Sequence, residues 1–204
     1  MITLFTPTSS VIGRFLEEQA SQPFTYNSVG CTQAVAPPGF DVDHTRSLLG
    51  QGEATFNAAC QALRQWRHFD LGWVTAGPRE TPLVVGQCIA VWARMLGLTW
   101  VNACRIVYLV DDDGPIRRFG FAYGTLPGHV EMGEERFLIE WDRSTDEVAY
   151  EILAHSRPRH WAVRLGYPLM RISQKRFARG SAAAMQRAVR TSRESSADRL
   201  PSRD

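Results

Sequence analysis

The segment from Arg118 to Asp142 constrains the fold most, because it predicts two antiparallel strands joined by a short turn. Side chains alternate along each half, as they do in a strand with one face buried. One face of the first strand carries Phe119, Phe121, Tyr123 and Thr125; one face of the second carries Glu135, Phe137, Ile139 and Trp141. Between them, the sequence LPGH at 126–129 fits a type II turn, with glycine at the position of positive φ.

Glycines on the other face of the first strand add a second constraint. Glycine weakens a strand, so Gly120 and Gly124 predict that something large lies close to that face. Gly133, which is followed by two glutamates, is interpreted as a β-bulge that redirects the side chains after it.

The remaining pattern predicts an α+β domain. A helix begins at Ser9 or Ser10, a second helix covers 53–67, and the longest helix covers 168–190. We expect strands at 24–29, 83–94, 99–110 and 148–156, a strand or loop at 69–75, irregular chain at 31–50, and turns at 111–115 and 142–146. The order favours a curved antiparallel sheet gripping a long C-terminal helix, with a cavity between them.

Length and charge suit one domain with extensions. We expect an N-terminal helical extension at 1–22, a single domain at 23–190 and a disordered tail at 191–204. No apolar run approaches a membrane span, and the N-terminus lacks the basic region of a signal peptide. The four cysteines are widely spaced, which favours buried thiols and a cytoplasmic location.

Several strings extend the pattern to a known family: FTYNSVGCT, LGQGEATFNAACQALRQW, RIVYLVDD, RFGFAYGTLPGHVEMGEERFLIEWD and SRPRHWAVRLGYPLMRISQKRF. Over roughly residues 20 to 190 the chain resembles the DUF1990 (UPF0548-like) family of bacterial and plant proteins. That family brings no activity that can be carried over. The element order in turn resembles the helix-grip architecture of the Bet v 1/START-like (SRPBCC) superfamily, which includes lipid-transfer proteins and polyketide cyclases.

Three residues near the turn form a candidate catalytic set. Tyr123, His129 and Glu131 could act as acid and base in an enzyme of the cyclase or hydrolase kind. Alternatively, His129 only closes the turn and the glutamates pair with arginines on the sheet. A His129 on the outer surface would exclude catalysis through it; a His129 buried beside Glu131 or Glu135 would favour the enzyme. We expect no metal, because a third nitrogen or sulfur ligand is missing, and no cofactor.

The aromatic face of the strands favours a small apolar or amphipathic ligand in the cavity. Arg105 is a candidate for an inward-facing guanidinium that recognises a carboxylate or phosphate. A filled hydrophobic core is the alternative. The expected ligand-binding residues are Arg105, Phe119, Phe121, Tyr123, Thr125, Glu135, Phe137, Trp141 and Tyr150.

The long helix is also strongly basic. Arg171, Lys175 and Arg179 recur at four-residue steps, and no acidic residue occurs from 157 to 193. Such a face could bind an anionic surface or nucleic acid, or could simply be solvated. No aromatic residues interleave with the charges, which argues against nucleic acid. Whether the chain forms a homodimer is left open by the sequence.

Overall fold

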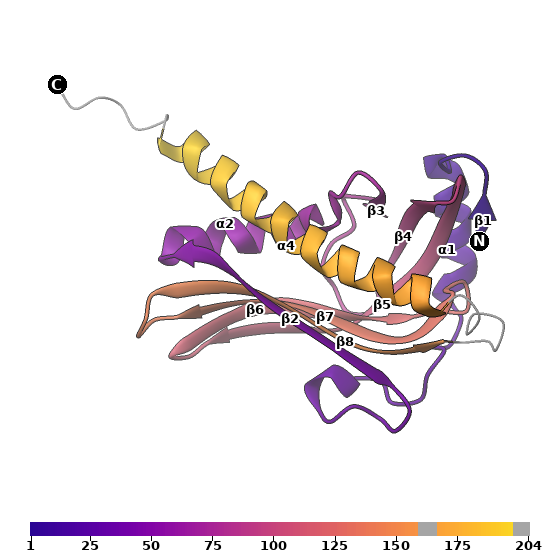
Figure 1. Cartoon of the computed structure of the whole chain (residues 1–204), viewed down its shortest axis with the longest axis horizontal. Coiled ribbons are helices and arrows are strands. Elements are labelled where there is room, and N and C mark those ends of the chain that lie inside the picture. The colour runs from indigo at the N-terminus through magenta and orange to yellow at the C-terminus, as the bar shows by residue number, and fades with distance from the viewer. Residues whose placement is uncertain (159–166, 198–204) are drawn as a thin grey trace.

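The computed structural model describes residues 1–158 and 167–197 (Figure 1). The helices are α1 (Ser9–Ala20), α2 (Glu53–Arg64) and α4 (Tyr167–Ala197), with 3-10 turns η1 (Cys31–Gln33) and η2 (Arg67–Phe69). The strands are β1 (Ile2–Thr3), β2 (Asp41–Gln51), β3 (Val74–Gly77), β4 (Cys88–Met95), β5 (Leu98–Asp113), β6 (Ile116–Thr125), β7 (Glu131–Asp142) and β8 (Glu147–Pro158).

Within the described residues, all eight strands form one sheet in the order β2-β8-β7-β6-β5-β4-β3, with β1 added beside β5. Every pairing is antiparallel. The sheet is curved, and α4 runs across its concave face next to α2 (Figure 1). This is the helix-grip arrangement predicted from the order of the elements.

The main core lies between the concave face and these two helices. Alternation brings Phe121, Phe137, Ile139 and Tyr150 inward, and each is essentially inaccessible to solvent. The helices add a complementary apolar stripe from Phe56, Leu63, Met185 and Val189. The core is therefore densely filled towards the C-terminal half of α4.

A second apolar cluster lies on the opposite face of the sheet. Ile12 and Phe15 of α1 pack against Ala90, Val101 and Ala103 of β4 and β5. The N-terminal helix α1 thus covers the outer face of β4 and β5, whereas α2 and α4 lie over the concave face of the sheet. The first 22 residues are tied to the domain by packing and by pairing of β1 with β5.

Close approaches were predicted for Gly120 and Gly124: at Gly124 the neighbour is the aromatic pair Phe24 and Tyr26, whereas at Gly120 it is the paired strand β7 at Phe137 and Leu138. A methyl group at Gly124 would overlap the Tyr26 hydroxyl. The turn at 126–129 is closed by a hydrogen bond from the His129 N–H to the Leu126 carbonyl, 2.8 Å long. It is not type II, because Gly128 has no positive φ. Gly128 is needed because a methyl group there would lie 2.6 Å from the Phe15 ring.

Other local predictions are wrong. Gly133 has a positive φ of 150°, but the pairing of β7 with β8 continues through it without a register shift, so no bulge forms. The chain at 24–29 forms no strand; it packs its aromatic side chains on the outer face. The segment 31–50 was predicted as irregular, but its second half belongs to strand β2, which the sequence analysis missed because its side chains are mainly polar.

α4 continues to Ala197, so residues 191–197, which were expected to belong to a disordered tail, are helical in the structure. Arg193 contributes to this extension, since its guanidinium donates a hydrogen bond to the Thr55 hydroxyl, 3.4 Å away on α2. Residues 198–204 lie outside the described part of the chain.

Candidate functional site

A cavity of about 200 Å3 lies between the concave face of the sheet and the N-terminal half of α4. Its apolar wall comes from β3, β4, β8, the segment after α2, and α4: Phe69, Trp73, Val74, Val91, Ala93, Ile152, Ala154, Phe177 and Ala178. Its polar residues include Asp43, Asn102, Tyr123, Thr125, His129, Glu131, Glu135, Ser156, Ser173 and Gln174. The cavity is therefore amphipathic, with one apolar side and one polar side.

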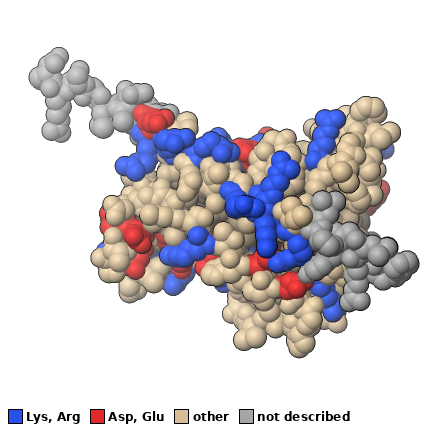
Figure 2. Space-filling model, viewed as in Figure 1, with Lys and Arg blue, Asp and Glu red and all other residues tan. Residues whose placement is uncertain are grey.

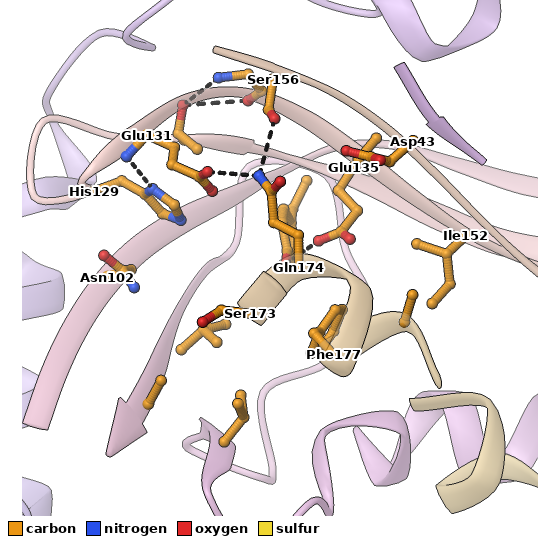
Figure 3. Close-up of a pocket in the computed structure, with 18 of the residues that line it drawn as sticks. Asp43, Asn102, His129, Glu131, Glu135, Ile152, Ser156, Ser173, Gln174 and Phe177 are labelled. Carbon is orange, nitrogen blue, oxygen red and sulfur yellow. Dashed lines mark hydrogen bonds between the residues drawn. The ribbon is translucent and has the colours of Figure 1, made fainter. Parts of the chain in front are cut away.

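Two carboxylates dominate the polar side (Figure 3). The Gln174 amide of α4 donates a hydrogen bond to Glu131 Oε1, 2.6 Å away, so the helix and the sheet meet at this residue. The Tyr123 hydroxyl donates to Glu135 Oε2 at 2.7 Å. Strand alternation places Glu131 and Glu135 on the same inward face of β7.

Burial raises the pKa of both carboxyl groups. The pKa of Glu131 rises to about 7, chiefly because the site is desolvated and secondarily because Asp43 is near. The pKa of Glu135 also rises to about 7, again through desolvation, against the opposing hydrogen bond from Tyr123. Burial likewise raises the pKa of the Tyr123 hydroxyl well above its usual value, so Tyr123 stays a hydrogen-bond donor.

His129 lies at the edge of the same cavity and is half-buried. Its Nδ1 accepts a hydrogen bond from the Glu131 N–H at 3.0 Å. The ring therefore does hold the turn, and it also faces the cavity (Figure 3). This hydrogen bond to Nδ1 fixes the orientation of the ring relative to the start of β7.

Asp43 and Arg171 form an ion pair at the rim of the cavity. Both guanidinium nitrogens of Arg171 bond the Asp43 carboxylate, the longer contact being 2.7 Å. This pair links α4 to β2, and it neutralises the third carboxylate of the cavity lining. Arg171 was predicted as part of an open basic face, but its charge is used inside the fold.

Some expected ligand-binding residues line the cavity and others do not. Tyr123, Thr125 and Glu135 lie in its wall, together with the expected catalytic residues His129 and Glu131. Phe121, Phe137 and Tyr150 point to the same face of the sheet, but deeper under α4, where the core is filled. They are core residues, because Trp66, His68 and Phe69 pack on the rings of Phe121 and Phe137, and Ser181 of α4 meets the Tyr150 hydroxyl, so that no space is left there.

The other expected ligand contacts lie at the periphery. Phe119 is covered by the guanidinium of Arg64, 3.9 Å from its ring centre, and Trp141 packs near Phe56. Arg105 points to the outer face and donates hydrogen bonds to the carbonyls of Gln19, Ala20 and Gln22. Its cation therefore caps the C-terminal end of α1 and does not enter the cavity.

Glu134 illustrates how alternation separates neighbouring carboxylates. Its side chain points to the outer face, where it accepts hydrogen bonds from the Tyr26 hydroxyl, the Gly30 N–H, the Thr32 N–H and the Thr32 hydroxyl. These four bonds fasten the loop that contains η1 to the sheet. Glu134 is a structural anchor, whereas Glu135 faces the cavity.

Several cavity residues escaped the sequence analysis. Gln174 and Phe177 belong to a helix whose facing side could not be read from its imperfect spacing. Asp43 was missed because β2 was interpreted as irregular chain. Trp73 and Phe69 come from the poorly patterned segment after α2, and only the tertiary structure brings them opposite β7.

The exposed side of α4 is basic, and Lys and Arg side chains follow it across the molecule (Figure 2). Its solvent-exposed cations in the described part of the helix are Lys175, Arg176, Arg179, Arg187, Arg190 and Arg193. Arg176 stacks on Trp73, 4.5 Å from the ring centre, above a shallow groove that also includes Leu71. The four cysteines are buried and free.

Two absences hold for the described part of the chain. No helix there is long and apolar enough to cross a membrane. Nor do three His, Cys, Asp or Glu side chains of residues 1–158 and 167–197 gather as the ligands of a metal ion would.

Comparison with solved structures finds similar folds at low identity. The structure of Ara h 8.0201 matches with a TM-score of 0.48 and 12% identity, over 75% of this chain and 99% of that one. Human STARD10 matches with a TM-score of 0.42 and 11% identity, over 97% of this chain and 85% of that one.

Sequence relatives are much closer. A UPF0548 protein of Dictyostelium discoideum is 38% identical over 202 residues, which cover 90% of this chain and 93% of that protein. A UPF0548 protein of Arabidopsis thaliana is 37% identical over 76% of each chain. The model of the family described as "Domain of unknown function (DUF1990)" matches residues 25–184, so this chain belongs to the DUF1990 family.

Proposed function

We propose that this protein binds a small amphipathic molecule in the cavity between the sheet and α4. The observation that carries the proposal is the composition of the cavity wall: an apolar side led by Phe69, Trp73 and Phe177, and a polar side led by Glu131 and Glu135. Pockets of this composition, apolar with a few convergent polar groups, are typical of ligand sites.

The size of the cavity limits the ligand. An apolar cavity of about 150 Å3 in another protein holds one benzene molecule. The cavity here, of about 200 Å3, therefore suits a single ring or a short aliphatic chain that carries one small polar group. The ring would lie against Phe69 and Phe177, and the polar group would reach the two carboxylates.

Two alternatives are supported less well. An acid–base enzyme of the cyclase or hydrolase kind would use His129, which lies beside Glu131 at the cavity edge, but the ring is only half-buried and its Nδ1 holds the turn by accepting the Glu131 N–H. Binding of an anionic surface or nucleic acid by α4 would rest on the exposed cations of the helix, and two of its arginines are already engaged, because Arg171 is paired with Asp43 and Arg176 lies on Trp73.

The test is a cavity-filling substitution. Ala154 lies opposite Glu135 in the β7–β8 pairing and lines the cavity, so Ala154→Trp places an indole in the ligand space. We expect the purified protein to bind 2-phenylethanol, an uncharged probe with a single ring and one hydroxyl group, in isothermal titration, and Ala154→Trp to weaken that binding at least tenfold.

Val42→Trp is the matched control. Val42 is 52% exposed on β2, where its neighbours Asp43 and Thr45 are the residues that line the cavity. The control variant should bind the probe as the wild type does. Equal probe binding by Ala154→Trp and wild type, with both folded by circular dichroism, would show that the probe does not enter the cavity and would refute the proposal.

A further inference from the structure

We infer that the cavity selects amphipathic ligands whose polar end is a protonated amine, and that Glu131 and Glu135 are the residues that make this selection. The inference rests on the proposed ligand-binding function, and it goes further by fixing the charge of the ligand.

The first support is the charge of the cavity wall. Among the described residues, its lining includes the carboxylates of Asp43, Glu131 and Glu135 and no lysine or arginine. Arg171 offsets Asp43 through their ion pair. Glu131 and Glu135 form no ion pair with a lysine or arginine in the described part of the chain. When both glutamates are ionised, an incoming carboxylate meets two like charges, whereas an ammonium group meets two opposite ones.

The second support is how the two carboxylates are held. Each has one neutral donor on one oxygen: Gln174 on Oε1 of Glu131, and Tyr123 on Oε2 of Glu135. The other oxygen of each carboxylate accepts no hydrogen bond from the described residues. Two fixed carboxylates, each with an unused oxygen, suit an ammonium group, which has three N–H donors and no acceptor.

The third support is the ionisation of the site. Desolvation raises the pKa of both glutamates, so at neutral pH each is protonated for part of the time. A bound cation lowers these pKa values, and binding then releases protons. The other groups that face the pair are Asp41 and Asp43 of β2, Arg171 of α4, and Tyr123 and His129.

The experiment compares three probes of matched shape: 2-phenylethylamine, 2-phenylethanol and phenylacetic acid. Isothermal titration at pH 7 gives their affinities for the wild type, Glu131→Gln, Glu135→Gln and the double variant. Glu140→Gln is the matched control, because Glu140 lies on the same strand but pairs with Arg46 and Arg118 outside the cavity. Repeating the amine titration in buffers of different ionisation enthalpy measures proton release.

We expect the amine to bind at least tenfold more tightly than the alcohol, the acid to bind most weakly, and amine binding to release protons. The double variant should lose the preference for the amine and keep its affinity for the alcohol; Glu140→Gln should change neither. Equal or tighter binding of the acid, or an amine preference that survives the double variant, overturns the selectivity alone. No binding of any of the three probes overturns both the selectivity and the proposed function.

Discussion

At the scale of single residues, His68 is a polar side chain that is fully buried among aromatic rings. Its ring is fully buried between Phe69, Phe121 and Phe137, the nearest ring centre being 4.4 Å away. Neither ring nitrogen has a hydrogen-bond partner among the described residues. Burial therefore lowers the pKa of His68 to about 3, and the folded protein holds this ring in its neutral form.

The stability of the fold should accordingly fall in acid because of this one ring. Between pH 6.5 and pH 3 the unfolded chain binds a proton at His68 and the folded chain does not, so stability is present above this window and is lost as pH falls through it. We expect His68 to account for roughly 3 kcal/mol of destabilisation between pH 7 and pH 4. Urea unfolding across this range should give a flatter pH dependence for His68→Leu, and an unchanged slope would contradict the assignment.

At the scale of elements, α4 packs closely against the segment that follows η2, and the contact is made at Gly180. Gly180 is in the middle of α4, where glycine costs about 1 kcal/mol relative to alanine. A methyl group at this position would lie 2.6 Å from Leu71 Cδ2. Glycine at 180 is therefore explained by the close approach of Leu71, which lies beside two residues of the cavity wall, Phe69 and Trp73.

This contact predicts non-additive substitutions. Gly180→Ala alone should stabilise the protein by much less than the roughly 1 kcal/mol of helix propensity, because Leu71 must move. In a Leu71→Ala background the same substitution should give the full gain. Chemical unfolding of the four proteins measures the coupling, and identical effects of Gly180→Ala in both backgrounds would show that the contact does not matter.

At the scale of the whole molecule, the cavity carboxylates lower the stability of the domain when they are ionised. The pKa values of Glu131 and Glu135 are raised from 4.5 to about 7, so the folded state binds more protons than the unfolded state between these values. The stability that the protonated carboxyl groups contribute is complete below pH 4.5 and is lost as the pH rises through 7. Groups that lower stability at neutral pH are typical of binding and catalytic sites.

The double variant Glu131→Gln/Glu135→Gln should therefore be more stable than the wild type at pH 8, by roughly 2 kcal/mol after allowance for solvent in the open cavity. Near pH 4.5 the two proteins should unfold at similar temperatures. Calorimetry at both pH values measures the difference. A variant that is less stable than the wild type at pH 8 would mean that the carboxylates stabilise the fold.

The sequence by itself determined the elements whose pattern is local. Alternation along 118–142 specified the central hairpin, because side chains on a strand point to opposite faces whatever surrounds them. The long apolar-striped segment specified a helix, and the order of the elements specified a helix gripped by an antiparallel sheet.

Only the tertiary structure decided where the cavity lies and which partners the charged side chains bind. Phe121 and Tyr123 have the same pattern and face, yet one is core and the other lines the cavity, because Trp66 and His68 pack on Phe121, whereas Tyr123 borders the cavity. Arg105 and Arg171 appear equally available in the sequence, but one caps α1 and the other pairs with Asp43. These outcomes depend on contacts between residues about 85 to 130 positions apart, and local periodicity carries no information about such contacts.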